Sequence, residues 1–190
     1  APARMQSFYQ LFLEAVAKWP QNIAVEMRHS QAAPGRGDVE QFTYLELRRM
    51  AESVGRWLAE AGPIRGERVA ILASNGPRWV AAYLGVMSAG GIAVPLDTAF
   101  TAQQVEKLLK DSGARYLVCD PRHFYIAETV ALSMGTATLL LEPVPGRRLP
   151  TLDVMFAADP GDFIPAPTGP EDLAVLLYTS GTTADPKGVV

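Results

Sequence analysis

The residues with the clearest chemical character lie near the end of the 190-residue chain, in the stretch YTSGTTADPKG from Tyr178 to Gly188. Hydroxyl side chains stand among small residues here, and Lys187 is the only cation of the stretch. A polyphosphate requires N–H and hydroxyl donors at close approach, and a positive charge that offsets its own. The stretch therefore predicts a phosphate-binding loop with these candidate ligands: Thr179, Ser180, Gly181, Thr182, Thr183, Lys187 and Gly188.

The residues before this loop predict how it is positioned. Residues 173–177 read LAVLL, an apolar run typical of a buried strand, which would deliver Tyr178 to the carboxyl end of that strand. Open α/β sheets bind their ligands at the carboxyl ends of their strands. Gly181 would let the backbone turn toward the anion, and Lys187 would supply the charge.

The loop differs from the phosphate-binding motif of kinase-like P-loop NTPases. The separation of Gly181 and Lys187 equals that of the glycine and lysine in G-x-x-x-x-G-K-[ST]. However, Pro186 stands at the second glycine, and Gly188 replaces the Ser or Thr that holds Mg²⁺. A P-loop NTPase is therefore a disfavoured alternative.

Capping patterns and apolar runs predict the elements that hold the loop. The segments 7–10 (SFYQ) and 43–46 (TYLE) have the capping-box pattern that begins a helix, and Asp120-Pro121 is a typical cap and first-turn pair. The Pro- and Gly-rich segment 142–170 predicts a long connection with little regular structure. Strands are expected at 23–25, 41–42, 68–72, 92–94, 114–118, 137–141 and 173–178. Amphipathic helices between buried strands predict an α/β fold: a doubly wound, mostly parallel sheet with helices on both faces.

Composition limits the class of protein. Hydrophobic residues make up 48% of the chain, enough for one sizeable core, and the net charge of −3 with no basic cluster argues against a nucleic-acid partner. The single cysteine, Cys119, excludes an internal disulfide and suits a reducing compartment. No apolar run approaches the roughly 18 residues of a membrane span, so we expect a cytoplasmic protein, with peripheral membrane contact left open. The two histidines have no candidate ligands nearby in sequence, so no metal site is expected within the chain.

Three segments together resemble a known family. Residues 173–188 (LAVLLYTSGTTADPKG) resemble the phosphate-loop motif of adenylate-forming enzymes, the AMP-dependent synthetases and ligases. These include acyl-CoA synthetases, firefly luciferase and peptide-synthetase adenylation domains. Residues 42–47 (FTYLEL) and 88–97 (SAGGIAVPLD) are similar to two further motifs of the family, in the same order. Ala184 departs from the motif, which usually has glycine there; at φ > 0 it would cost about 1 kcal/mol.

The resemblance implies an activity and its participants. Residues 73–85 (ASNGPRWVAAYLG) are most similar to fatty acyl-CoA synthetases, with peptide-synthetase domains as the second choice. An acyl-CoA synthetase uses ATP with Mg²⁺ to convert a carboxylic acid, here a fatty acid, into an acyl-adenylate, and then transfers the acyl group to CoA. Lys187 would be the catalytic group within this chain, and the small molecules would be its partners.

The family's adenine pocket, acyl tunnel, metal-binding carboxylate and C-terminal lysine belong downstream. Residues 1–190 are therefore predicted to be the N-terminal α/β subdomain of the large adenylation domain, inactive by itself. A non-catalytic nucleotide-binding α/β module remains the alternative from a different class.

Overall fold

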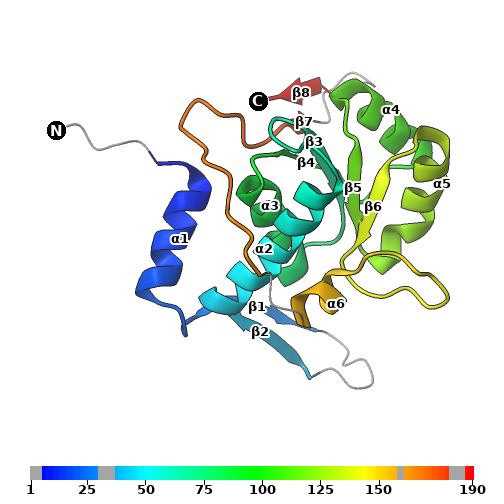
Figure 1. Ribbon diagram of the computed structural model, residues 1–190. Helices are drawn as coiled ribbons and strands as arrows, with labels where there is room; N and C mark the ends of the chain where they lie inside the picture. Colours follow the sequence, from blue (N-terminus) through cyan, green and yellow to red (C-terminus); the bar gives the residue numbers. More distant parts are fainter. Residues whose placement is uncertain (1–5, 30–36, 158–160, 180–186) are drawn as a thin grey trace.

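A sheet of four short parallel strands lies at the centre of the chain (Figure 1). The structure, a computed structural model, describes residues 6–29, 37–157, 161–179 and 187–190. The strands follow the order β4-β3-β5-β6. Their bounds are Arg68–Leu72 (β3), Ile92–Pro95 (β4), Tyr116–Cys119 (β5) and Ala137–Leu140 (β6). Because β3 lies between β4 and β5, the chain crosses from one side of β3 to the other after β4.

Helices cover both faces of this sheet. The helices are α2 (Tyr44–Ala61), α3 (Pro77–Ser88), α4 (Ala102–Ser112) and α5 (Phe124–Met134), the last preceded by the 3-10 turn η1 (Pro121–His123). Val69 and Ile71 of β3 belong to a buried cluster with α2 and α3, whereas Ala70 and Leu72 belong to a second cluster with α4 and α5. The strand is apolar on both faces because each face is covered. The predicted doubly wound α/β fold is confirmed.

The N-terminal part adds a helix and a hairpin beside the first helical layer. Helix α1 spans Phe8–Lys18, and strands β1 (Ile23–Arg28) and β2 (Val39–Thr43) pair antiparallel. The predicted capping boxes are present at Ser7 and Thr43, where each hydroxyl accepts a hydrogen bond from the backbone N–H three residues on. Asp120 also caps as predicted, by accepting from the N–H of His123.

Two expectations are corrected by the structure. The segment 142–170 contains a short helix, α6 (Leu152–Ala157), which was not predicted because six residues are too few to show a helical period. Leu152 is fully buried, so tertiary packing stabilises this helix. The segment 173–178 is not a full strand of the sheet: only Val175 bridges Ala93 of β4.

The strand expected at 173–178 forms later and in another sheet. Strand β7 (Leu177–Thr179) pairs antiparallel with β8 (Lys187–Val189), outside the four-stranded sheet. Apolar composition predicted an extended segment correctly, but not its partner.

The second helix and the third cross at unusually close range. A Cβ added at Gly85 of α3 would lie 2.6 Å from both the Ala51 carbonyl oxygen and Val54 Cβ of α2. Atoms at that separation overlap, so only glycine allows this approach. No helix in the described part of the chain has the length and apolar character needed to span a membrane.

The packing of β5 generates a prediction about Cys119, the single cysteine. Its side chain is fully buried, and burial together with the nearby Asp120 charge raises the pKa of the thiol to about 12. Since the thiolate is the reactive form, we expect a thiol reagent at pH 8 to label Cys119 at least about 100-fold more slowly in the folded protein than after unfolding in guanidinium. Mass-spectrometric mapping of labelled peptides from the full-length protein measures both rates. Equal rates would contradict the packing of β5.

Candidate phosphate-binding site

The β7–β8 hairpin brings together the two ends of the predicted phosphate loop. Thr179 lies opposite Lys187, and Tyr178 opposite Gly188, in the antiparallel register. Thr179 and Gly188 are exposed. The remaining predicted ligands, Ser180, Gly181, Thr182 and Thr183, lie outside the described residues, as do Ala184 and the side chain of Lys187. The structure thus places the backbone at both ends of the loop, and the ligand assignment stays a prediction.

Gly188 has a packing role that the motif did not suggest. A Cβ at this position would lie 3.1 Å from Leu176 Cδ1 and 3.5 Å from the ring of Tyr178. The missing side chain therefore leaves room for the tyrosine ring across the strand pair. Gly188 therefore allows the Tyr178 ring to pack, independently of any contact between the Gly188 backbone and a ligand.

Tyr178 ties the hairpin to α4. Its hydroxyl group donates a hydrogen bond to Asp111 Oδ2 at 2.6 Å, and its ring packs with the cluster under α4 and α5. Burial and the Asp111 carboxylate raise the pKa of Tyr178 to about 12. Asp111 was missed by sequence reasoning, because nothing in an exposed helix position indicates a partner 67 residues away.

This contact corrects the predicted position of Tyr178. Helix α4 ends at Ser112 and β5 begins at Tyr116, so Asp111 lies at the amino-terminal edge of the sheet. The hydroxyl group of Tyr178 therefore points to that edge and not to the carboxyl edge. The physical reason is that the segment pairs with β4 only around Ala93, and then leaves the sheet to pair with β8 (Figure 1).

The carboxyl edge of the sheet has its own cluster of polar groups. Asp120, after β5, accepts a hydrogen bond from the Ser74 N–H (2.8 Å), after β3, and lies 2.6 Å from His123 Nδ1. These bonds join the two loops where the chain changes sides of β3, the usual ligand position of such sheets. Both oxygens of this carboxylate are already used by the chain itself.

A hollow of about 410 Å³ lies beside this cluster, at the carboxyl ends of β3 and β4. Its polar and aromatic lining includes Ser74, Asn75, Trp79, Asp97 and Thr98. None of the predicted phosphate ligands that the structure describes lines it. Within the described ranges, no three His, Cys, Asp or Glu side chains gather as metal ligands, so we assign no residue to the Mg²⁺ that accompanies ATP.

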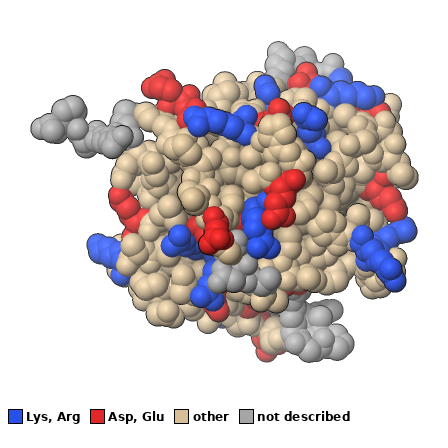
Figure 2. All heavy atoms as spheres, viewed as in Figure 1, with Lys and Arg blue, Asp and Glu red and all other residues tan. Residues whose placement is uncertain are grey.

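Charged side chains are mixed on the face shown in Figure 2, where basic and acidic groups alternate without a continuous area of one sign. Among the charged side chains that the structure describes, Arg78 contacts both Glu40 and Asp153 at 2.7 Å. These ion pairs join α3 to β2 and α6, so they connect elements of the fold.

Comparison with known proteins identifies the family. The model of a family described as AMP-binding enzyme matches residues 12–190. The chain is 33% identical over 155 residues to the 3-hydroxybenzoate–CoA ligase of Aromatoleum sp. (strain CIB). The aligned region covers 81% of this chain and 30% of that protein. It is also 32% identical over 188 residues to tyrocidine synthase 3 of Brevibacillus parabrevis. That aligned region covers 97% of this chain and 2% of the synthase.

A solved structure agrees with this match. The ATP-bound MatB of Rhodopseudomonas palustris superposes with a TM-score of 0.72 at 30% identity, over 95% of this chain and 34% of that chain. The chain therefore belongs to the AMP-binding enzyme family, as its motifs predicted. The chain spans 30% of the length of the 3-hydroxybenzoate–CoA ligase and 34% of the length of the MatB chain.

The Tyr178–Asp111 contact generates a prediction about alkaline stability. An unfolded tyrosine ionises near its ordinary pKa of 10.0, whereas folded Tyr178 keeps its proton up to about pH 12. Stability from this group is complete below pH 10 and is lost as the pH rises from 10 to 12. We therefore expect Tyr178→Phe to lower the free energy of unfolding at pH 8 by about 1 kcal/mol or less, and to flatten its decline between pH 10 and 12.

Unfolding in urea at several pH values measures both effects in the full-length protein. Tyr125→Phe is the matched control, because Tyr125 is 68% exposed. Identical pH slopes for wild type and Tyr178→Phe would contradict the assignment.

Proposed function

We propose that the full-length protein activates a carboxylic acid with ATP and then transfers the acyl group to CoA. The observation that carries this proposal is the family match over residues 12–190, which includes the loop motif. The chain would form the N-terminal α/β subdomain of the large adenylation domain and would be inactive alone. We place the reaction in the cytoplasm, since a single cysteine suits a reducing compartment.

The proposed reaction has two steps. A carboxylate oxygen attacks the α-phosphorus of ATP, the bond to the bridging oxygen breaks, and pyrophosphate leaves with the acyl-adenylate formed. The CoA sulfur then attacks the acyl carbon, and AMP leaves. Catalysis of the first step consists mainly of positioning and charge neutralisation.

The phosphate loop would act in the first step alone. Its hydroxyl groups and the Lys187 ammonium would hold the β- and γ-phosphates, which leave as pyrophosphate. Mg²⁺, when bound with ATP, would neutralise part of the same charge. The hairpin supports this role because it fixes Thr179 and Lys187 opposite each other at the base of the loop.

Three classes of acid are candidate substrates. We propose a fatty acid, because our interpretation of the motif at residues 73–85 is that it resembles fatty acyl-CoA synthetases. An aromatic acid is the second candidate, because two relatives that are 33% identical are named 3-hydroxybenzoate–CoA ligase and feruloyl-CoA synthase. An amino acid is the third, given the similarity to tyrocidine synthase 3.

Isotope exchange between ATP and pyrophosphate tests the function in the full-length protein. The acids supplied would be a fatty acid, 3-hydroxybenzoate, ferulate and a mixture of amino acids. Exchange with a fatty acid, followed by acyl-CoA formation when CoA is added, is the expected result. Exchange with amino acids alone would indicate a peptide-synthetase domain, and none with any acid would favour a non-catalytic module.

Within that assay, Lys187→Ala should slow exchange by about 10- to 100-fold. The estimate follows from the 1.5–3 kcal/mol of a hydrogen bond to a charged group and about 1.4 kcal/mol for each tenfold change in rate. Lys110→Ala is the matched control, since Lys110 pairs with Glu106 on the surface of α4. Wild-type exchange in Lys187→Ala would rule out its assignment.

A further inference from the structure

A long segment without helix or strand leads to the predicted phosphate loop. We call residues 161–176 the strap. In Figure 1 the strap runs from the region of α6, between α1 and the α2–α3 pair, to β7. Regular structure does not hold residues 161–173, so individual contacts must fix their course.

Three backbone hydrogen bonds attach the strap to α3 and β4. The Ala166 N–H donates to the Ser88 carbonyl at 2.7 Å, at the end of α3. The Ala93 N–H of β4 donates to the Ala174 carbonyl at 2.9 Å, and the Leu176 N–H donates to the Ala93 carbonyl at 2.8 Å. The last of these lies one residue before β7, so the strap sets the point where the hairpin begins.

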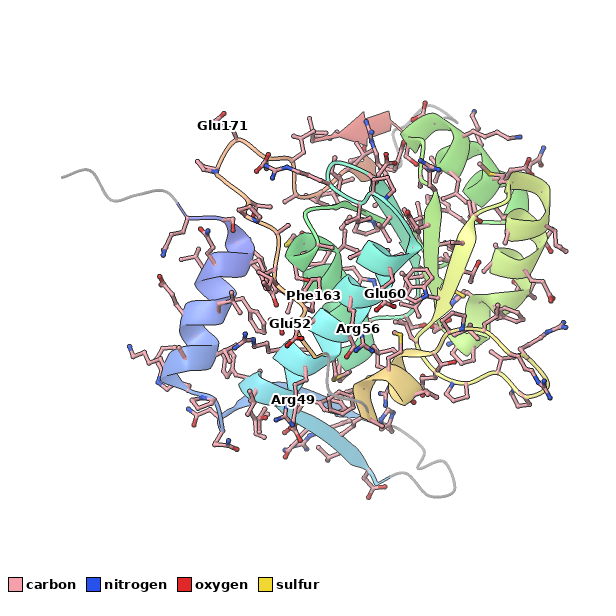
Figure 3. The ribbon with its side chains drawn as sticks, viewed as in Figure 1. Arg49, Glu52, Arg56, Glu60, Phe163 and Glu171 are labelled. Carbon is pink, nitrogen blue, oxygen red and sulfur yellow. The ribbon has the colours of Figure 1, made fainter. Side chains whose placement is uncertain are left out.

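The first anchor of the strap is the ring of Phe163, which lies against α2. A Cβ added at Gly55 would lie 2.8 Å from Phe163 Cζ and 2.3 Å from Ser88 Oγ. Gly55 therefore forms a notch that Phe163 and α3 fill together. Figure 3 shows Phe163 beside α2, close to Arg56.

Glycine at position 55 destabilises α2, and the packing of Phe163 gives a reason for it. Glycine in the middle of a helix is about 1 kcal/mol less favourable than alanine, so a helical glycine usually has a packing reason. Phe163 is only partly exposed, whereas the next residue, Ile164, is 84% exposed. Of these two neighbouring apolar residues, Phe163 therefore packs against the notch, whereas Ile164 faces solvent.

We infer that Phe163 is a positioning residue for adenylation: its ring, seated in the Gly55 notch, fixes the strap on the α2–α3 pair and thereby fixes where β7 and the phosphate loop stand. The inference rests on the proposed function. Phe163 touches no substrate; it acts through the strap. Misplacement of reacting groups by about 1 Å can reduce a rate about 100-fold. A residue that only positions the phosphate loop can therefore change the rate of adenylation.

The two half-reactions of the full-length protein separate positioning from general damage. ATP–pyrophosphate exchange uses the phosphate loop, whereas thioester formation from supplied acyl-adenylate and CoA involves no pyrophosphate. Phe163→Ala should lower exchange at least about 10-fold and raise the KM for ATP, while thioester formation stays within about twofold of wild type. Phe163→Leu should restore part of the exchange, and Ile164→Ala, the matched control, should change neither half-reaction.

Each other outcome has a definite meaning. If Phe163→Ala and Phe163→Leu lose both half-reactions equally, the role of Phe163 is merely structural. The inference is also overturned if ATP–pyrophosphate exchange is unchanged in Phe163→Ala, or if Ile164→Ala loses as much exchange as Phe163→Ala. Wild-type protein without exchange would refute the proposed function, and the inference with it. An active wild type with an unaffected Phe163→Ala would refute the inference alone.

The seat itself is tested by a double-mutant cycle on thermal unfolding. Gly55→Ala should lower the unfolding midpoint more in the wild-type background than in Phe163→Ala, because the ring clash is absent from the latter. This measurement needs no activity. Equal shifts in the two backgrounds would show that Phe163 does not occupy the notch.

Discussion

The close crossing of α2 and α3 is the constraint on which the rest of the structure depends. Gly85 brings α3 against Ala51 and Val54 of α2, and Gly55 brings α2 against Ser88 of α3. This pair covers one face of the sheet, and the strap is attached to the pair through Phe163 and the Ser88 carbonyl. A wider crossing would move the strap away from β4, and the hairpin that holds the predicted loop would move with it.

The hairpin has a second support on the opposite layer. Tyr178 reaches Asp111 of α4, and Gly188 makes room for its ring. Two layers that are separate in the sequence therefore meet at the base of the phosphate loop. The loop motif determines which groups are available, whereas the two layers determine where the motif stands.

Much of this could be predicted from the sequence, for local reasons. The capping boxes at Ser7 and Thr43 and the apolar strands are encoded by neighbouring residues, so the α/β fold followed from them. The family followed from the motifs at residues 42–47, 88–97 and 173–188. The course of 173–178 could not be predicted, because its pairing depends on β4 and β8, not on its own composition. Gly55 gave a signal that was available in the sequence, a glycine inside a strong helical pattern, but its partner lies 108 residues away, at Phe163.

If the strap fixes the position of β7 and the phosphate loop, as we infer, ATP binding should stabilise the strap together with the hairpin. Hydrogen exchange of the full-length protein, followed by mass spectrometry with and without ATP–Mg²⁺, measures this stabilisation segment by segment. We expect ATP to slow exchange in peptides from the β7–β8 hairpin and, in parallel, in peptides from residues 161–176. Protection confined to the carboxyl edge around Ser74 and Asp97, with the strap and hairpin unchanged, would contradict it.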